Sequence, residues 1–300
     1  MKSVRGYILV LTATIFWGAS AVVAKLLFNR LMEPIVLVQM RVMLSCVLIV
    51  GYCLLFRPDL LHVRFGDSAR IGLLGVLGVA GSNFTYYYTI QQINVSTAIL
   101  IQYTAPLLVL AYAALTQEES LNFLKVGAAI ISLVGCYFAV GGTQISLPKM
   151  PMLGLASGIA SAFCWAFATV YVRRLLRSYS VWTILAYSFV FATLFWFLFV
   201  PPWDIATAGY TPGDMSVFVG FALISVLIPH SCYFIGVRYI TASRAIITGT
   251  FEPIVAIVGS FLFLGDLMAP LQVMGAILVI TAIAVLQVRR EEGESIECTQ

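Results

Sequence analysis

Charged residues are scarce in this sequence of 300 residues. Asp, Glu, Lys and Arg together make up 10% of it, whereas 61% of the residues are hydrophobic. Because soluble domains carry about a quarter charged residues, this composition predicts an integral membrane protein. Long polar stretches are absent as well, so no separate soluble domain is expected. The charged tail at 289–300 is predicted to be disordered and cytoplasmic.

Several patterns that carry chemistry are also missing. The chain has only two histidines, His62 and His230, and therefore no His-Glu-x-x-His zinc motif. Its six cysteines form no Cys-x-x-Cys pair, which argues against a disulfide framework and against a metal site. There is no Walker-type ATP-binding loop. We therefore expect no enzyme activity, no metal and no cofactor.

The sequence consists mainly of long apolar runs. Runs of about 18 to 24 residues are long enough to cross a bilayer, and short polar or proline-containing breaks separate them. They predict an all-α protein with ten transmembrane helices, at roughly 6–27, 34–56, 69–90, 95–115, 122–142, 152–173, 180–200, 215–237, 243–264 and 269–288.

The basic residues predict the orientation of these helices. With Arg41 inside the second helix, the remaining Lys and Arg divide thirteen to three between the two membrane sides. The richer side is expected to be cytoplasmic and carries both termini, which predicts a multi-pass protein of the cell (inner) membrane. The net charge of +4 is explained by this basic rim, so no nucleic-acid partner is expected. The richer side contains Lys2, Arg5, Arg57, Arg64, Arg70, Lys125, Arg173, Arg174, Arg177, Arg238, Arg244, Arg289 and Arg290, and the other side contains Lys25, Arg30 and Lys149.

The chain also repeats itself. The segment Gln102–Pro106 returns 147 residues later as Gly249–Pro253, and at the same offset Asn83 corresponds to His230 and Glu119 to Asp266. These matches predict two five-helix repeats, 1–147 and 148–288. Because five is odd, the second repeat enters the membrane from the opposite side. Such inverted repeats are typical of secondary transporters, in which they provide inward-open and outward-open states.

Four short motifs in the two halves resemble those of a known family. The early Trp17-Gly18, the run Tyr103-Thr104-Ala105-Pro106, and Phe251-Glu252-Pro253 followed by Phe263-Leu264-Gly265-Asp266 resemble the EamA-type drug/metabolite transporters. The resemblance covers essentially residues 5–288. Asp266 departs from it, because the family usually has Glu in this loop. The resemblance implies transport of a small solute across the lipid bilayer, often the export of amino acids or related metabolites.

Glu252 is the leading functional candidate. A carboxylate inside an apolar run is costly unless it faces protein or water, and small residues such as Gly249 and Ala256 share its predicted helix face. Pro253 and its counterpart Pro106 each remove a backbone hydrogen bond, which predicts a helix break in matching positions of the two halves. Glu252 is expected to carry a coupling proton or to bind an amine directly, and the sequence leaves both open.

Polar and aromatic residues near midspan are the other candidates. Asn83 and His230 occupy equivalent positions, and His230 is either a buried histidine bonded within the protein or a proton-sensitive substrate contact. For Arg41 a structural role is favoured, and Glu118-Glu119 is expected to be a solvated loop pair. The predicted substrate-binding residues are Trp17, Asn83, Tyr86, Tyr87, Gln102, Tyr103, Trp165, His230 and Tyr233.

The sequence leaves three functional classes open. A secondary transporter, working by alternating access with a proton as the candidate coupling ion, accounts for the repeats and the helix breaks. An intramembrane enzyme is the weaker alternative, because the metalloprotease motif and acidic pairs on membrane faces are absent. A non-transporting membrane sensor is the third, and no soluble signalling domain supports it.

Overall fold

A computed structural model of the protein describes residues 2–28, 34–141, 151–207 and 209–288. Within these ranges the regular secondary structure is helical throughout. Seven helices there are long and apolar enough to cross a membrane, and two shorter apolar helices, Phe123–Ala139 and Val181–Trp196, accompany them. The protein is therefore an all-helical, multi-pass membrane protein. The predicted tail at 289–300 and the predicted repeat boundary at 147/148 lie outside the described residues.

Six helices run without interruption, and four of the predicted spans are built from several segments. The uninterrupted helices are α1 (Lys2–Phe28), α2 (Pro34–Phe56), α7 (Phe123–Ala139), α8 (Met152–Leu175), α9 (Val181–Trp196) and α15 (Pro270–Val288). The segmented ones are α3 (Phe65–Leu73) with η2 (Leu74–Gly81) and α4 (Ser82–Gln92); α5 (Val95–Gln102) with α6 (Ala105–Thr116); α11 (Pro212–Ala222) with η5 (Leu223–Leu227) and α12 (Ile228–Val237); and α13 (Ala242–Gly249) with α14 (Glu252–Leu264). Two short helices, η1 (Pro58–Leu61) and α10 (Pro202–Thr207), lie in connections.

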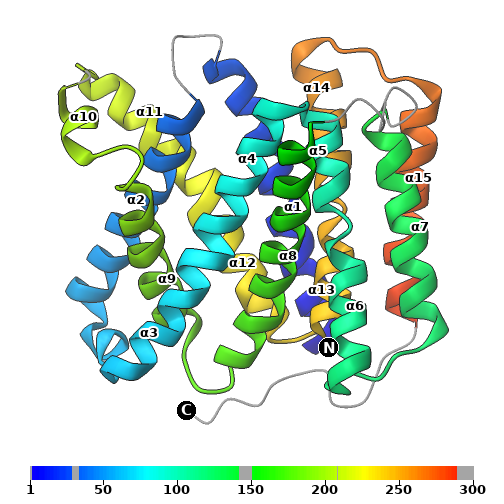
Figure 1. Cartoon of the computed structure of the whole chain (residues 1–300), viewed down its shortest axis with the longest axis horizontal. Coiled ribbons are helices and arrows are strands. Elements are labelled where there is room, and N and C mark those ends of the chain that lie inside the picture. The colour runs from blue at the N-terminus through cyan, green and yellow to red at the C-terminus, as the bar shows by residue number, and fades with distance from the viewer. Residues whose placement is uncertain (1, 29–33, 142–150, 208, 289–300) are drawn as a thin grey trace.

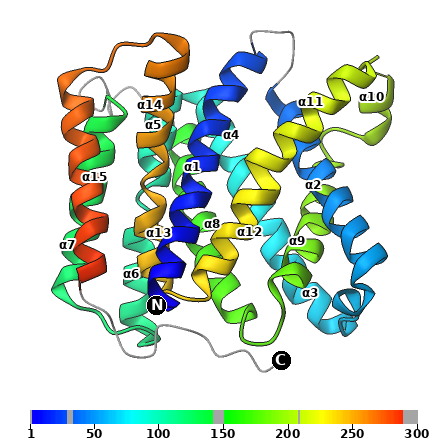
Figure 2. The ribbon, with the colours of Figure 1, turned by 180° about the vertical axis from the view of Figure 1, so that it is seen from behind.

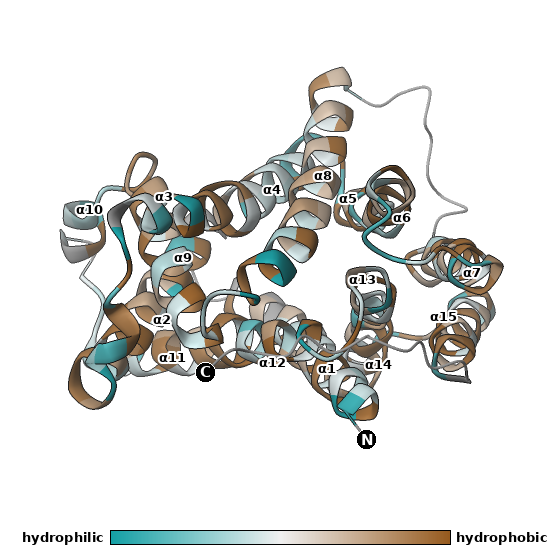
Figure 3. Ribbon diagram, turned by 90° about the horizontal axis from the view of Figure 1, so that it is seen from below, coloured by the Kyte–Doolittle hydropathy of each residue, from teal (hydrophilic) through white to brown (hydrophobic). Residues whose placement is uncertain are grey.

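The helices stand side by side and cross the molecule from one edge to the other (Figures 1 and 2). α1 begins and α15 ends at the lower edge in both views, and we call this the terminal edge. The connection between α6 and α7 also lies at the terminal edge, whereas the connection between α14 and α15 lies at the opposite edge. Seen from the terminal edge, hydrophilic residues gather at helix ends and connections, and the outer faces of the helices are largely apolar (Figure 3).

The run predicted at 69–90 differs from the other predicted spans. Its last part, α4, is polar for a membrane helix, since it contains Ser82, Asn83, Thr85, Gln91 and Gln92, and the run is not among the seven apolar spans. Its middle part, η2, is a π-helical segment, and a second π-helical segment, η5, precedes α12. π-Helical turns are often found at functional sites, and here both lead directly into residues that line the cavity described below.

Glycine permits the close pairing of α7 with α15. A Cβ atom added to Gly275 would lie 2.5 Å from the backbone N of Ala139 and 2.5 Å from the backbone O of Gly135. In lipid, helix association depends on such close packing rather than on the hydrophobic effect. The backbones of α7 and α15 therefore approach more closely than any larger residue at position 275 would allow.

We expect Gly275→Ala to lower the free energy of unfolding by about 1–3 kcal/mol, because the added methyl group meets backbone atoms that cannot move aside. Thermal unfolding in detergent micelles measures the effect. Gly127→Ala is the matched control: it lies in α7, and a Cβ atom there would have no neighbour within 4 Å. The control should be neutral or stabilising by up to about 1 kcal/mol. Equal behaviour of the two variants would contradict the packing argument.

Candidate functional site

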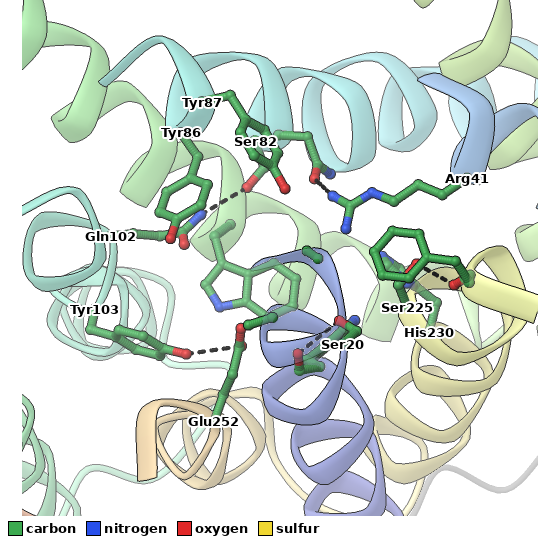
Figure 4. Close-up of a pocket in the computed structure, with 16 residues that line it drawn as sticks. Ser20, Arg41, Ser82, Tyr86, Tyr87, Gln102, Tyr103, Ser225, His230 and Glu252 are labelled. Carbon is green, nitrogen blue, oxygen red and sulfur yellow. Dashed lines mark hydrogen bonds between the residues drawn. The ribbon is translucent and has the colours of Figure 1, made fainter. Parts of the chain in front are cut away.

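A cavity of about 180 Å³ lies between the helices (Figure 4). Residues from both halves of the chain surround it, with α1, α2, α4 and α5 from the first half and α8, α11, η5, α12 and α14 from the second. The lining residues are Trp17, Ser20, Ala21, Ala24, Arg41, Ser82, Asn83, Tyr86, Tyr87, Gln102, Tyr103, Trp165, Phe221, Ser225, His230 and Glu252.

The structure brings most of the sequence-predicted residues together in this cavity. Tyr233 is the exception among the predicted substrate-binding residues. It is buried, its hydroxyl is hydrogen-bonded to that of Thr169 at 2.9 Å, and its ring packs against Trp17 and Trp165. Tyr233 therefore supports the cavity wall from behind. The predicted residues that line the cavity are Trp17, Asn83, Tyr86, Tyr87, Gln102, Tyr103, Trp165, His230 and Glu252.

Glu252 stands at an interruption between two helices. α13 ends at Gly249 and α14 begins at Glu252, and the proline at position 253 occupies the first turn of α14, where a missing N–H is tolerated. The first half repeats the arrangement: α5 ends at Gln102, and α6 begins at Ala105, immediately before Pro106. Both prolines are buried and line no part of the cavity. The residues beside the prolines, Gln102, Tyr103 and Glu252, line the cavity instead.

The two interruptions meet through one hydrogen bond. Tyr103 follows the last residue of α5, and its hydroxyl donates to Oε2 of Glu252 at 2.9 Å (Figure 4). Hydrogen-bonding groups buried in a membrane protein need such partners. Since Tyr103 occupies one oxygen of the carboxylate, the orientation of Glu252 in the cavity is fixed while it can still accept other donors.

Arg41 supplies a positive charge to the same cavity. It projects from α2, and its Nη2 donates to Oδ1 of Asn83 at 2.6 Å, while Nδ2 of Asn83 donates to the backbone O of Val79 at 2.7 Å. The guanidinium also lies over the ring of Tyr87, with 5.7 Å from Cζ to the ring centroid. Arg41 is thus held on the α4 side of the cavity, with donors to spare for an anionic ligand.

Aromatic rings form another wall. Trp17 packs edge-on against Trp165 and against His230, with ring centroids 5.5 and 5.3 Å apart. Nδ1 of His230 lies 2.8 Å from the backbone O of Val226, which requires a proton on that nitrogen and leaves Nε2 as the atom whose role depends on the charge state of the ring. The cavity therefore combines a flat apolar surface with two opposite charges.

Sequence reasoning missed some of the lining. Arg41, for which we expected a structural role, lines the cavity, as do Ser20 and Ser225. The available signal for Arg41 was a lone charge inside an apolar helix, which by itself points to function. Serines are common in membrane helices and gave no comparable signal. Among the described residues there is no group of three or more His, Cys, Asp or Glu side chains that could hold a metal ion.

The EamA-like transporter family matches residues 4–141 and again residues 152–288. The uncharacterized inner membrane transporter YicL of Salmonella typhimurium is 24% identical over 287 residues, covering 94% of this chain and 95% of its own length. The threonine/homoserine exporter RhtA of Escherichia coli is 26% identical over 292 residues (95% and 92%), and the riboflavin transporter ImpX of Fusobacterium nucleatum is 25% identical over 223 residues (71% and 71%). A solved crystal structure shares the fold with a TM-score of 0.77 at 17% identity, covering 94% of this chain and 96% of that one.

Proposed function

Because the chain belongs to the EamA-like transporter family, we propose that it is a secondary transporter that exports a small dipolar solute of the amino-acid class. The observation that carries the proposal is that Arg41 and Glu252 line the same cavity. A free amino acid has a carboxylate and an ammonium group, and these complement a guanidinium and a carboxylate respectively. The relative named as a threonine/homoserine exporter agrees with this class of solute.

The proposed topology has ten spans in two inverted five-helix repeats, with both termini in the cytoplasm of the cell (inner) membrane. Two features support it. α5 and α13 are both eight residues long, begin 147 positions apart and start after a side-chain cap, Asn94 and Thr241 respectively. The family also matches twice, once in each half. The excess of basic residues on the side of the terminal edge supports a cytoplasmic location of this edge.

In the proposed cycle the two halves rock about the cavity, which opens to one side at a time. Solute enters from the cytoplasm, and its carboxylate binds Arg41 while its ammonium binds Glu252. After release on the other side, Glu252 takes up a proton, and Tyr103 remains its hydrogen-bond donor. The carboxylate is thereby neutralised for the return step, since an unpaired buried charge is costly. On the cytoplasmic side Glu252 releases this proton before it binds the next solute, so the cycle exchanges one proton for one solute.

Counterflow in proteoliposomes tests the choice of solute. Vesicles loaded with unlabelled threonine or homoserine should take up the labelled amino acid. N-acetylthreonine lacks the ammonium and threonine amide lacks the carboxylate, so each should compete at least about tenfold more weakly than threonine, because one of the two charged contacts is lost. Riboflavin serves as the comparison solute without these two charges. Exchange of riboflavin without exchange of any amino acid would overturn the proposed solute class.

A further inference from the structure

The connection between α6 and α7 holds a buried acid that the transport site does not use. Glu119 was expected to be solvated together with Glu118, and this is wrong for Glu119: its side chain is only 8% exposed. It accepts hydrogen bonds from the backbone N of Ala242 at 2.7 Å and from the hydroxyl of Ser243 at 2.5 Å. The fully buried Lys125 places its ammonium 3.7 Å from Glu119.

These contacts clamp the first turn of α13 to the α6–α7 connection at the terminal edge. A carboxylate at a helix N-terminus is favoured by the free N–H groups and by the helix dipole. α13 is buried along all eight residues and leads directly to the interruption before Glu252. The clamp therefore holds, from the terminal edge, the short helix that positions one side of the transport cavity.

The offset of 147 residues identifies a corresponding set in the other half. Glu119 corresponds to Asp266, Ala242 and Ser243 correspond to Val95 and Ser96, and Lys125 corresponds to Gln272. Ser96 is the same residue type as its counterpart, and Val95 is the first residue of α5, as Ala242 is of α13. The second set thus has an acid, a helix N-terminus and a serine hydroxyl, with a neutral amide in place of the lysine.

The second set is arranged differently from the first. Asp266, Val95, Ser96 and Gln272 line one cavity of about 340 Å³ between α5 and the α14–α15 connection. Asp266 is exposed, as is Val95 at 51%, whereas Glu119 and Ala242 in the first set are largely buried. The α14–α15 connection, which lines this cavity, lies at the edge opposite the terminal edge (Figure 1). The first set is therefore closely packed, whereas the second set surrounds a cavity.

We propose that Asp266 is the latch of the gate at that opposite edge. In the alternate state Asp266 accepts hydrogen bonds from the N–H of Val95 and the hydroxyl of Ser96, the 340 Å³ cavity closes, and Glu119 releases Ala242 and Ser243. Glu119 and Asp266 are then equivalent positioning residues that alternate in capping α13 and α5. This inference rests on the proposed alternating-access function. Because Gln272 replaces the lysine, the latch at this edge is the weaker of the two.

Cross-linking measures the closure directly. In a full-length background with all six cysteines replaced by alanine, the pair Val95→Cys and Leu267→Cys spans the cavity from α5 to the residue after Asp266. Both positions are exposed, at 51% and 90%, so the fold tolerates them. With copper phenanthroline as oxidant, in lipid nanodiscs and without added solute, we expect a disulfide to form as the protein visits the closed state. Adding Asp266→Asn should slow its formation about tenfold, because a charge-assisted cap is lost.

Asp214→Asn is the matched control. Asp214 is a capping acid of α11, hydrogen-bonded to the N–H and hydroxyl of Thr211 at 2.8 and 2.7 Å, and it plays no part in the proposed latch. It should leave the rate unchanged. Failure of the parent pair to cross-link, or equal rates with and without Asp266→Asn, would overturn the latch. Threonine counterflow is measured separately on the wild type. If Asp266→Asn slows cross-linking but the wild type shows no counterflow, only the transporter proposal is contradicted. If the wild type shows counterflow but Asp266→Asn does not slow cross-linking, only the latch is contradicted.

Discussion

Replacing Arg41 with glutamine is expected to weaken amino-acid binding by about 100-fold. Arg41 is the positive charge of the cavity, and it is held toward it by Asn83 and Tyr87. Removing one partner of a desolvated charge pair costs about 2–5 kcal/mol, most of it as faster dissociation. Glutamine can still hydrogen-bond to Asn83, so the cavity itself should persist. Isothermal titration of purified protein with threonine or homoserine measures the loss.

Two further variants sharpen this prediction. Arg41→Lys keeps the charge but loses the planar group with several donors, so an intermediate loss of about tenfold is expected. Arg57→Gln makes the same change at an exposed arginine that pairs with Asp59 near the terminal edge, and it should bind like the wild type. If Arg41→Gln bound the amino acid as tightly as Arg57→Gln, the solute carboxylate would not be bound by Arg41.

The second large effect is on stability. We expect Glu119→Gln to lower the free energy of unfolding by about 3–5 kcal/mol, because it removes the negative charge beside the fully buried ammonium of Lys125. Thermal unfolding in detergent micelles measures the change. Glu118→Gln is the matched control, since Glu118 and its partner Arg174 are partly exposed, with side-chain exposures of 31% and 45%. That control should cost less than about 1 kcal/mol.

A double variant distinguishes charge from shape. Glu119→Gln combined with Lys125→Met removes both charges, so it should be clearly more stable than Glu119→Gln alone. If adding Lys125→Met to Glu119→Gln lowered the free energy of unfolding as much as Lys125→Met alone lowers that of the wild type, the two charges would not be coupled. In that case the clamp would depend on the hydrogen bonds to α13 alone.

The helices and the residues around the helix breaks were predictable from the sequence for a simple reason. Apolar length identifies membrane-spanning runs, and Pro106 and Pro253 lie beside the observed interruptions of α5–α6 and α13–α14. The internal repeat also relates Asn83 to His230, and these two residues come from different halves and line the same cavity. At these positions the residues of one short segment, together with the matching segment of the other repeat, were sufficient to predict the site.

Contacts between distant segments were not predictable in this way. Arg41 meets Asn83 across 42 positions, and Glu119 meets Ser243 across 124. Helical periodicity says which residues share a face, but it does not say which helix that face meets. Tyr233 shows the same difficulty: it lies one turn from His230, yet that turn places it behind the tryptophans rather than in the cavity. The burial of Glu119 in a loop likewise depends on where α13 begins in space.

Concentrative flux through Glu252 tests the central claim most directly. Wild type, Glu252→Gln and the control Glu118→Gln are reconstituted in proteoliposomes, and threonine uptake is followed with and without an imposed pH gradient. We predict that the wild type and Glu118→Gln accumulate threonine against its gradient only when the pH gradient is present, whereas Glu252→Gln does not accumulate it under either condition. Accumulation by Glu252→Gln equal to that of the wild type would contradict the account.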